Sequence, residues 1–286
     1  MISLERIDQA LAWARAALAE AGESEPLDAA ILLAHVLGVD RTVLIAHPDQ
    51  PLLPDQAAVY WALIRRRAAG VPVAYLLGRR AFFDRDLAVT PDVLIPRPET
   101  EHLVEMALDW ARGRTDLRLV DVGTGSGAIA VTLAAHLPDA RAWAVDVSAE
   151  AVAVARQNAD AYGLAERITF LHGDLLVPVM ACGVQADMIA ANLPYIPSGD
   201  LAALAVTQHE PRLALDGGPD GLDVIRRLLA QAPDVLAPAG LLLLEIGAGQ
   251  GQAVMALAEA AFPRAAARLH LDYAGHDRVV SLERKG

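Results

Sequence analysis

The chain has 286 residues, 54% of them hydrophobic, and a formal net charge of −12 at pH 7. The apolar fraction supports a large core and excludes general disorder. The acidic balance weighs against a DNA or RNA substrate, because nucleic-acid-binding proteins usually present a basic surface.

Residues 1 to about 70 are predicted to form a small helical domain. Apolar residues recur at helical spacing from the start of the chain, at Ile2, Leu4, Ile7, Leu11 and Ala14. Further helices are predicted over 27–37, 41–46 and 55–69, and Gly38 and Gly70 are stop signals. We find no strand pattern in this stretch.

Residues 71–97 differ in composition, because prolines, glycines and aromatic residues become frequent there. Two short extended segments, 81–83 and 87–89, flank Asp84-Arg85-Asp86 and predict a β-hairpin. Pro98 suits the first turn of a helix, where its missing N–H costs nothing. We therefore predict a connector with a hairpin at 71–97, followed by a helix from 98 to about 112.

From residue 118 onward, predicted strands and helices alternate. The strands are 119–122, 142–146, 168–171, 187–191, 241–246, 268–272 and 278–282. The helices are 128–136, 149–162, 222–231 and 251–261. This alternation predicts an α/β fold with a mostly parallel sheet covered on both faces, and the last two strands predict an antiparallel hairpin. We take 98–286 as the catalytic domain.

The expected compartment is the cytoplasm. Cys182 is the only cysteine, so the chain cannot form an internal disulfide, as is typical of a reducing compartment. Glu5 and Asp8 lie in an amphipathic N-terminal pattern, so we expect no signal peptide. No apolar run approaches the roughly 20 residues that span a bilayer. We expect a monomer with no metal site, no membrane association and no direct nucleic-acid binding.

A glycine-rich loop joins the strand at 119–122 to the next helix. Its candidate cofactor-binding residues are Asp121, Gly123, Thr124, Gly125, Ser126 and Gly127. The glycines allow a sharp turn and the close approach of a ligand. The dinucleotide-binding pattern G-x-G-x-x-G would require glycine at 128, where this chain has alanine. Asp121 attracts an ammonium group and repels a pyrophosphate. The loop therefore favours S-adenosylmethionine over NAD or FAD, and a turn without a ligand is the third interpretation.

Two later strand ends extend this candidate cofactor site. Asp146 ends the second strand, where a carboxylate can accept both hydroxyls of an adenosine ribose. Asp174 and Leu175 follow the third strand, at a position where a side chain can recognise an adenine amino group. Taken alone, Asp174 suits a turn equally well.

The segment Asn192-Leu193-Pro194-Tyr195 follows an apolar run that ends a predicted buried strand. The Asn192 side-chain oxygen and the Leu193 carbonyl can accept the two N–H groups of a planar amide or amino group. Pro194 holds Leu193 extended, and Tyr195 can pack on the plane of that group. An ordinary Asn-Pro turn is the alternative. Because carboxyl ends of parallel strands share an edge, these four candidate catalytic residues are expected to face the glycine loop, and Asn192 is also a candidate cofactor-binding residue.

The chain resembles the glutamine N5-methyltransferases of peptide chain release factors, often called HemK-like. The run 95–100, Ile-Pro-Arg-Pro-Glu-Thr, is its most specific match. Segments 121–130 and 210–222 are similar to the family's cofactor loop and to the segment after its clamp. The resemblance covers about 70–286 well and 1–70 in character only. This chain has Leu193 where the family usually has proline. The leucine keeps the main-chain carbonyl but makes the backbone less stiff.

The resemblance implies a Rossmann-like, class I methyltransferase fold with a seven-stranded sheet. It implies transfer of a methyl group from S-adenosylmethionine, with S-adenosylhomocysteine as product, to the side-chain nitrogen N5 of the glutamine in a Gly-Gly-Gln loop. It also implies class 1 release factors as protein partners, with the helical domain at 1–70 recognising that substrate.

Two other functions stay open. Adenine-N6 methyltransferases also use Asn-Leu-Pro-Tyr, and such an enzyme is expected to have a basic, aromatic-rich groove beside Tyr195. A non-catalytic module that binds an adenosyl ligand is the third hypothesis. Arg97 and Glu99 suit contact with the cofactor or partner, or an interdomain ion pair. His209 and Glu210 are interpreted as packing residues of a loop.

Overall fold

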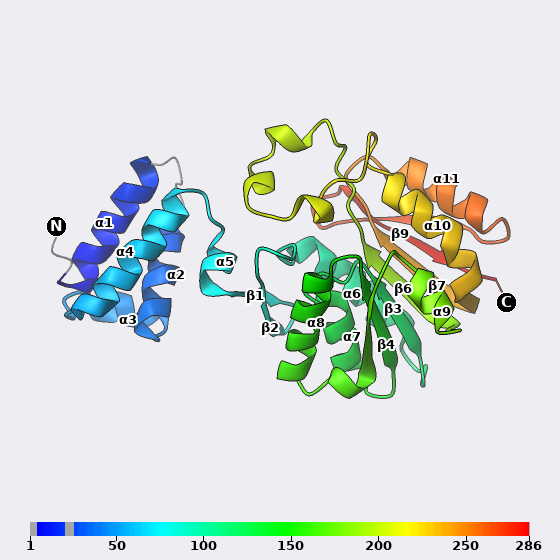
Figure 1. The fold of residues 1–286 in the computed structure, drawn as a ribbon, viewed down its shortest axis with the longest axis horizontal. Helices are drawn as coiled ribbons and strands as arrows, with labels where there is room; N and C mark the ends of the chain where they lie inside the picture. The colour runs from blue at the N-terminus through cyan, green and yellow to red at the C-terminus, as the bar shows by residue number, and fades with distance from the viewer. Residues whose placement is uncertain (1–4, 21–25, 286) are drawn as a thin grey trace. The chain divides into compact units, whose positions relative to one another are not determined.

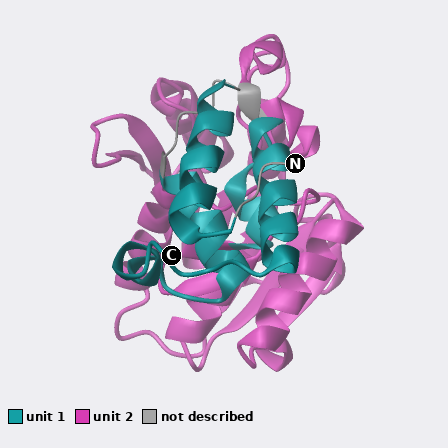
Figure 2. Cartoon of the chain, turned by 90° about the vertical axis from the view of Figure 1, so that its left-hand side faces the viewer, with its two compact units in different colours: residues 1–79 teal, residues 80–286 magenta. Residues whose placement is uncertain are grey.

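The computed structural model describes residues 5–20 and 26–285, which fall into two units, Met1–Arg79 and Arg80–Gly286 (Figure 2). The hairpin and the segment 89–97 belong to the second unit. The functional division of the chain into 1–70, 71–97 and 98–286 stays a prediction.

The first unit is helical, as the sequence predicts. Its helices are α1 (Ile7–Glu20), α2 (Pro26–Leu37), α3 (Arg41–Ala46), α4 (Pro54–Ala68) and α5 (Val73–Leu77). Their apolar faces meet in one core that includes the fully buried Tyr60 and Ile64. The predicted contributions of Ile2 and Leu4 lie outside the described residues. The single turn of α5 is not predicted, because five residues are too few to establish a helical period.

A two-stranded hairpin of β1 (Arg79–Phe82) and β2 (Arg85–Ala88) starts the second unit. Arg79, the first residue of β1, is the last residue of the first unit. The hairpin is confirmed, but its predicted connector, 84–86, starts one position too late and ends two positions too late. Phe83 and Asp84 form the turn, with Phe83 at a φ of 57°, and Arg85 already belongs to β2. Helix α6 (Pro98–Trp110) follows, with its proline in the first turn.

The main sheet has seven strands in the order β5-β4-β3-β6-β7-β9-β8 (Figure 1). They are β3 (Arg118–Val122), β4 (Arg141–Asp146), β5 (Ile168–His172), β6 (Ala186–Asn192), β7 (Leu236–Glu245), β8 (Ala267–Leu271) and β9 (Asp277–Glu283). The strands from β3 to β7 pair in parallel, and β9 pairs antiparallel with both β7 and β8. The predicted sheet and its C-terminal hairpin are confirmed.

Helices cover both faces of this sheet (Figure 1). One layer comprises α6, α7 (Ala128–His136) and α8 (Ala149–Ala161), and the other comprises α9 (Val177–Ala181), α10 (Asp223–Val235) and α11 (Gly251–Ala261). Successive residues of β3 alternate between the two cores: Leu119 packs in the first and Val120 in the second. None of the described helices combines the length and apolar character needed to span a bilayer.

The strand order reverses direction between β3 and β6. Val122 of β3 lies opposite Ala191 of β6, so the loops that leave both strands start side by side. In open α/β sheets, ligands bind at such a switch point, outside the carboxyl ends of the strands. The fold thus brings together the glycine loop and Asn192, as the sequence predicts.

Asn158 ties the hairpin to the glycine loop. This buried side chain of α8 donates to the carbonyls of Ala88 (3.0 Å) and Ser126 (2.8 Å) and accepts from the Ala88 N–H (2.7 Å). One carboxamide therefore satisfies three main-chain groups from two segments that are far apart in sequence.

We expect Asn158→Leu to lower the free energy of unfolding by at least about 2 kcal/mol, because the substitution leaves buried main-chain groups without partners. Urea unfolding followed by circular dichroism measures this change. The matched control is Gln157→Leu at the neighbouring exposed position, which should change stability by less than about 0.5 kcal/mol. Equal effects of the two substitutions would contradict the structural role of Asn158.

Candidate active site

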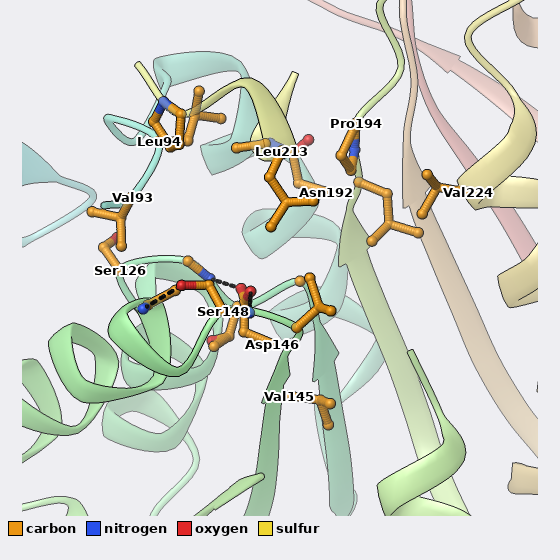
Figure 3. A pocket seen from close by; sticks show the side chains of 18 of the residues that line it. Val93, Leu94, Ser126, Val145, Asp146, Ser148, Asn192, Pro194, Leu213 and Val224 are labelled. Atoms are coloured by element: carbon orange, nitrogen blue, oxygen red, sulfur yellow. Dashed lines mark hydrogen bonds between the residues drawn. The ribbon is translucent and has the colours of Figure 1, made fainter. Parts of the chain in front are cut away.

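A cavity of about 390 Å³ lies at the carboxyl ends of β3, β4, β5 and β6. Figure 3 shows its labelled side chains converging from several segments, with Asp146 and Ser148 on one side and Asn192 and Pro194 on another. The predicted site residues on its wall are Gly123, Thr124, Gly125, Ser126, Asp146, Asp174, Leu175, Asn192, Leu193 and Pro194. Asp121, Gly127 and Tyr195 are not among its lining residues.

The glycine loop adopts a conformation that requires glycine. Gly123, Gly125 and Gly127 have φ values of 73°, 55° and 81°, in the left-handed region that other residues rarely adopt. The N–H groups of Gly123 and Thr124 both donate to the Val145 carbonyl at 2.9 Å. A Cβ at Gly125 would meet nothing within 4 Å, so this position leaves open space beside the cavity. Gly127 instead packs against α8 and starts α7.

Asp146 lies on the cavity wall, where it also braces the glycine loop. Its Oδ2 accepts from the Gly125 N–H and its Oδ1 from the Ser148 N–H, both at 2.9 Å. Burial raises the pKa of this carboxyl, while these backbone hydrogen bonds oppose the shift. Each carboxylate oxygen keeps a lone pair for a ligand hydroxyl.

Asp121 lies behind the glycine loop and is only 3% exposed. Its Oδ2 accepts from the Thr124 hydroxyl at 2.6 Å and from the Ala130 N–H at 3.1 Å. Its Oδ1 is buried and has no hydrogen-bond partner among the described residues. Burial, with a smaller contribution from Asp146, raises the pKa of Asp121 to about 7. Asp121 therefore holds the loop in shape from behind.

Asp174 and Leu175 reach the far end of the cavity. The Asp174 carboxylate forms an ion pair with Arg227 of α10, and both residues line the wall. Leu175 is buried and has a φ of 49°. In this structure the Asp174 carboxylate is thus already paired with Arg227, and a hydrogen bond from an adenine amino group to Asp174 stays a prediction.

Leu193 brings the clamp segment against the glycine loop. A Cβ placed on Gly123 would lie 2.9 Å from Leu193 Cδ2 and 3.6 Å from the Asn192 carbonyl oxygen. Gly123 is therefore needed both for its backbone angle and for this close approach. The Tyr195 carbonyl accepts from Gln250 Nε2 at 3.0 Å, which fixes the end of the segment.

A second cavity of about 160 Å³ adjoins the first at the clamp. The residues shared by both walls are Leu94, Arg97, Asn192, Leu193 and Ala214. Tyr195, Ile196 and Leu215 complete the second wall, which is largely apolar. Burial is the main reason that the pKa of Tyr195 rises to about 12, so its hydroxyl stays protonated at neutral pH.

Arg97 and Glu210 form an ion pair within the second unit. Arg97 Nη2 donates to Glu210 Oε1 at 2.6 Å, and the Ile95 N–H donates to Glu210 Oε2 at 3.2 Å. The Glu210 side chain is 2% exposed, compared with 35% for Arg97. Of the two interpretations of Arg97, the interdomain ion pair is wrong, because its partner lies in the same unit, and contact with the cofactor or partner stays a prediction. Glu210 instead joins the 95–97 segment to the loop that carries Ala214.

Two buried polar residues behind Asn192 were missed from the sequence. Asn192 Nδ2 donates to Thr100 Oγ1 at 3.0 Å, and Thr100 Oγ1 donates to Glu245 Oε2 at 2.6 Å. Thr100 lies on α6, and Glu245 ends β7 directly opposite Asn192. A signal for Glu245 was present: a lone carboxylate ends an apolar run at the same sheet edge as Asp146 and Asn192.

Two family models match the chain. One is described as the PrmC N-terminal domain and matches residues 9–78, and the other as a methyltransferase domain and matches residues 119–209.

Curated relatives match over nearly the whole chain. A release factor glutamine methyltransferase of Moorella thermoacetica is 47% identical over 279 residues, covering 97% of this chain and 98% of that relative. A release factor glutamine methyltransferase of Bacillus cereus is 40% identical over 283 residues, covering 97% and 99% of the two chains.

Solved structures share the fold at low sequence identity. A methyltransferase from Pyrococcus furiosus has a TM-score of 0.53 and 17% identity, and the match covers 79% of this chain and 98% of that one. A ribosomal protein L11 methylase from Lactobacillus delbrueckii has a TM-score of 0.51 and 20% identity, and the match covers 69% and 84%.

The buried Asp121 predicts a pH dependence of stability. Between about pH 4 and about pH 7, folded Asp121 keeps a proton that the unfolded chain has lost, so stability falls as the pH rises through this range. Asp121→Asn should make this decrease shallower, because asparagine does not titrate. Urea unfolding at pH 5 and pH 7 measures the slope. The exposed Asp139→Asn is the matched control, and equal slopes in the two variants would contradict the prediction.

Proposed function

Because this chain belongs to the release factor glutamine methyltransferase family, we propose that it transfers a methyl group from S-adenosylmethionine to the side-chain nitrogen of a release-factor glutamine. The target is the glutamine of a Gly-Gly-Gln loop in a class 1 release factor, and the product of the cofactor is S-adenosylhomocysteine.

The observation that carries this proposal is the junction of the two cavities at the clamp. Asn192 and Leu193 line both the larger cavity at the glycine loop and the smaller, apolar cavity beside Tyr195. A cofactor in the larger cavity and a substrate side chain in the smaller one would therefore meet at these two residues.

The residues of the larger cavity fit S-adenosylmethionine. Its volume of about 390 Å³ is within the usual range of roughly 300–1,000 Å³ for small-molecule sites. Carboxylates of Asp92, Asp146 and Asp174 lie on its wall, and both wall arginines are paired with carboxylates. The unpartnered Oδ1 of Asp121 is a further hydrogen-bond acceptor behind the loop. This balance suits a cationic ligand better than a diphosphate.

We assign the parts of the cofactor to named residues. Asp146 would accept the ribose hydroxyls, Asp174 and Leu175 would contact the adenine, and the glycine loop with Asp121 behind it would surround the amino acid part. When bound, S-adenosylmethionine supplies an activated methyl group on a cationic sulfur, so transfer needs positioning more than a strong base.

The clamp residues position the substrate amide. The Asn192 side-chain oxygen and the Leu193 carbonyl accept its two N–H groups, so that the nitrogen lone pair points toward the larger cavity. Tyr195 packs on the amide plane and excludes water. A neutral phenol suits this role, and the Tyr195 hydroxyl, whose pKa burial raises further to about 12, is protonated at neutral pH.

The wall beside Tyr195 weighs against an adenine-N6 methyltransferase. Among the described residues, Arg97 is the one basic residue that lines the smaller cavity, and its guanidinium is paired with Glu210. A nucleic-acid groove would need unpaired basic groups and further aromatic side chains for stacking.

We propose that the helical domain at 1–70 recognises the release factor, because none of its described residues lines either of these cavities. Helix α4 exposes Trp61, which stacks on Trp13 and lies 4.6 Å below the Arg65 guanidinium. Such a rigid, amphipathic patch is typical of protein contacts.

Asn192→Ala should lower kcat by at least roughly 100-fold, because the substrate amide loses one of its two acceptors and is misplaced. The measurement uses labelled S-adenosylmethionine and a purified class 1 release factor, with mass spectrometry to locate the methyl group. Calorimetry should give a Kd for S-adenosylhomocysteine within about twofold of the wild-type value.

Gln157→Ala, at an exposed position of α8, is the matched control and should retain wild-type activity. Wild-type protein that leaves the Gly-Gly-Gln glutamine unlabelled but methylates adenine in an oligonucleotide would overturn the proposed substrate. Cofactor binding without any methyl transfer would instead support a binding module.

A further inference from the structure

A buried chain of hydrogen bonds runs from the clamp into the protein interior. It joins Asn192 at the end of β6, Thr100 on α6 and Glu245 at the end of β7. Thr100 and Glu245 are only 4% and 1% exposed, whereas Asn192 reaches the walls of both cavities. The three side chains thus link the proposed reaction site to a carboxylate that lies in neither cavity wall.

The direction of these hydrogen bonds determines which end of the Asn192 carboxamide faces Thr100. A hydroxyl has one hydrogen, and Thr100 donates it to Glu245 Oε2 at 2.6 Å. Thr100 Oγ1 can then only accept from Asn192, so the NH2 group points inward at 3.0 Å. The Asn192 side-chain oxygen is left free of this contact, as an acceptor for the substrate.

We propose that Thr100 and Glu245 are positioning residues, which hold Asn192 with its oxygen, and not its NH2 group, presented to the substrate amide. This inference rests on the proposed function of Asn192 as an acceptor. A carboxamide turned by 180° would set NH2 against the NH2 of the substrate, and neither group could accept a hydrogen bond.

The charge on Glu245 controls the direction of the hydrogen bonds between Asn192, Thr100 and Glu245. As a carboxylate, Glu245 can only accept, and it takes the Thr100 hydrogen. As a neutral carboxylic acid, it can donate to Thr100, whose hydrogen is then free to turn toward the Asn192 oxygen. Protonation of Glu245 therefore removes the constraint that orients the clamp.

The groups around Glu245 put this change near neutral pH. Glu99 on α6 favours the neutral form, while the hydroxyl of Thr100, the guanidinium of Arg278 on β9 and the Asn192 side chain favour the carboxylate. Burial is the largest influence and raises the pKa of Glu245 to about 7. Activity should accordingly be lost as the pH falls through this value.

The first test replaces the middle of the chain. Thr100→Val keeps the shape but removes the hydroxyl, and kcat should fall roughly tenfold or more, while the Kd of S-adenosylhomocysteine stays within about twofold. Thr100→Ser should restore most of the activity. Thr132→Val is the matched control, because Thr132 is also buried and helical but its hydroxyl has no partner among the described residues. Unchanged kcat in Thr100→Val would overturn the proposal.

The second test observes Asn192 directly and does not depend on the release factor. The side-chain amide signals of Asn192 in ¹⁵N-labelled protein, identified by their loss in Asn192→Ala, should shift with a midpoint near pH 7. This shift should disappear in Glu245→Gln and in Thr100→Val, but persist in Thr132→Val. Signals that do not titrate would refute the positioning role, even if the enzyme methylates release factors. A titrating signal in a protein inactive on release factors would leave the positioning role standing and refute the substrate.

Discussion

The site depends on one close approach between two loops that leave adjacent parallel strands. Gly123 follows β3 and Leu193 follows β6, and the pairing of Val122 with Ala191 sets both loops at the same height. A side chain on Gly123 would collide with Leu193, so a residue without Cβ is needed there. This contact joins the cavity at the glycine loop to the cavity at the clamp, and the proposed chemistry needs that junction.

Much of the fold follows from patterns within short segments of the sequence. Alternating strands and helices predicted the parallel sheet, and the glycines with Asn192 identified the edge where the cavity lies. Errors occurred where a pattern was too short or interrupted. The five-residue α9 was missed. Strand β7 begins at Leu236, before the predicted 241, because Pro238 and the left-handed Ala239 interrupt the strand pattern in the sequence but not the strand itself.

The arrangement of charged side chains was harder to predict, because most of their partners lie far apart in sequence. Asp121 was expected to meet a ligand, but it lies behind the loop and holds Thr124. Arg97 pairs with Glu210, 113 positions away, and Thr100 bonds to both Asn192 and Glu245, which lie 92 and 145 positions away. The contacts of Arg97 and Thr100 arise where α6 packs against the sheet, and no local spacing encodes them.

Leu193 forms part of both cavity walls, although only 4% of its surface is exposed. It also occupies the space that a Cβ at position 123 would need. A substitution at position 193 therefore changes the shapes of both cavities together. A smaller residue at 193 would widen both chambers at once, while the left-handed backbone angle at 123 would still require glycine there.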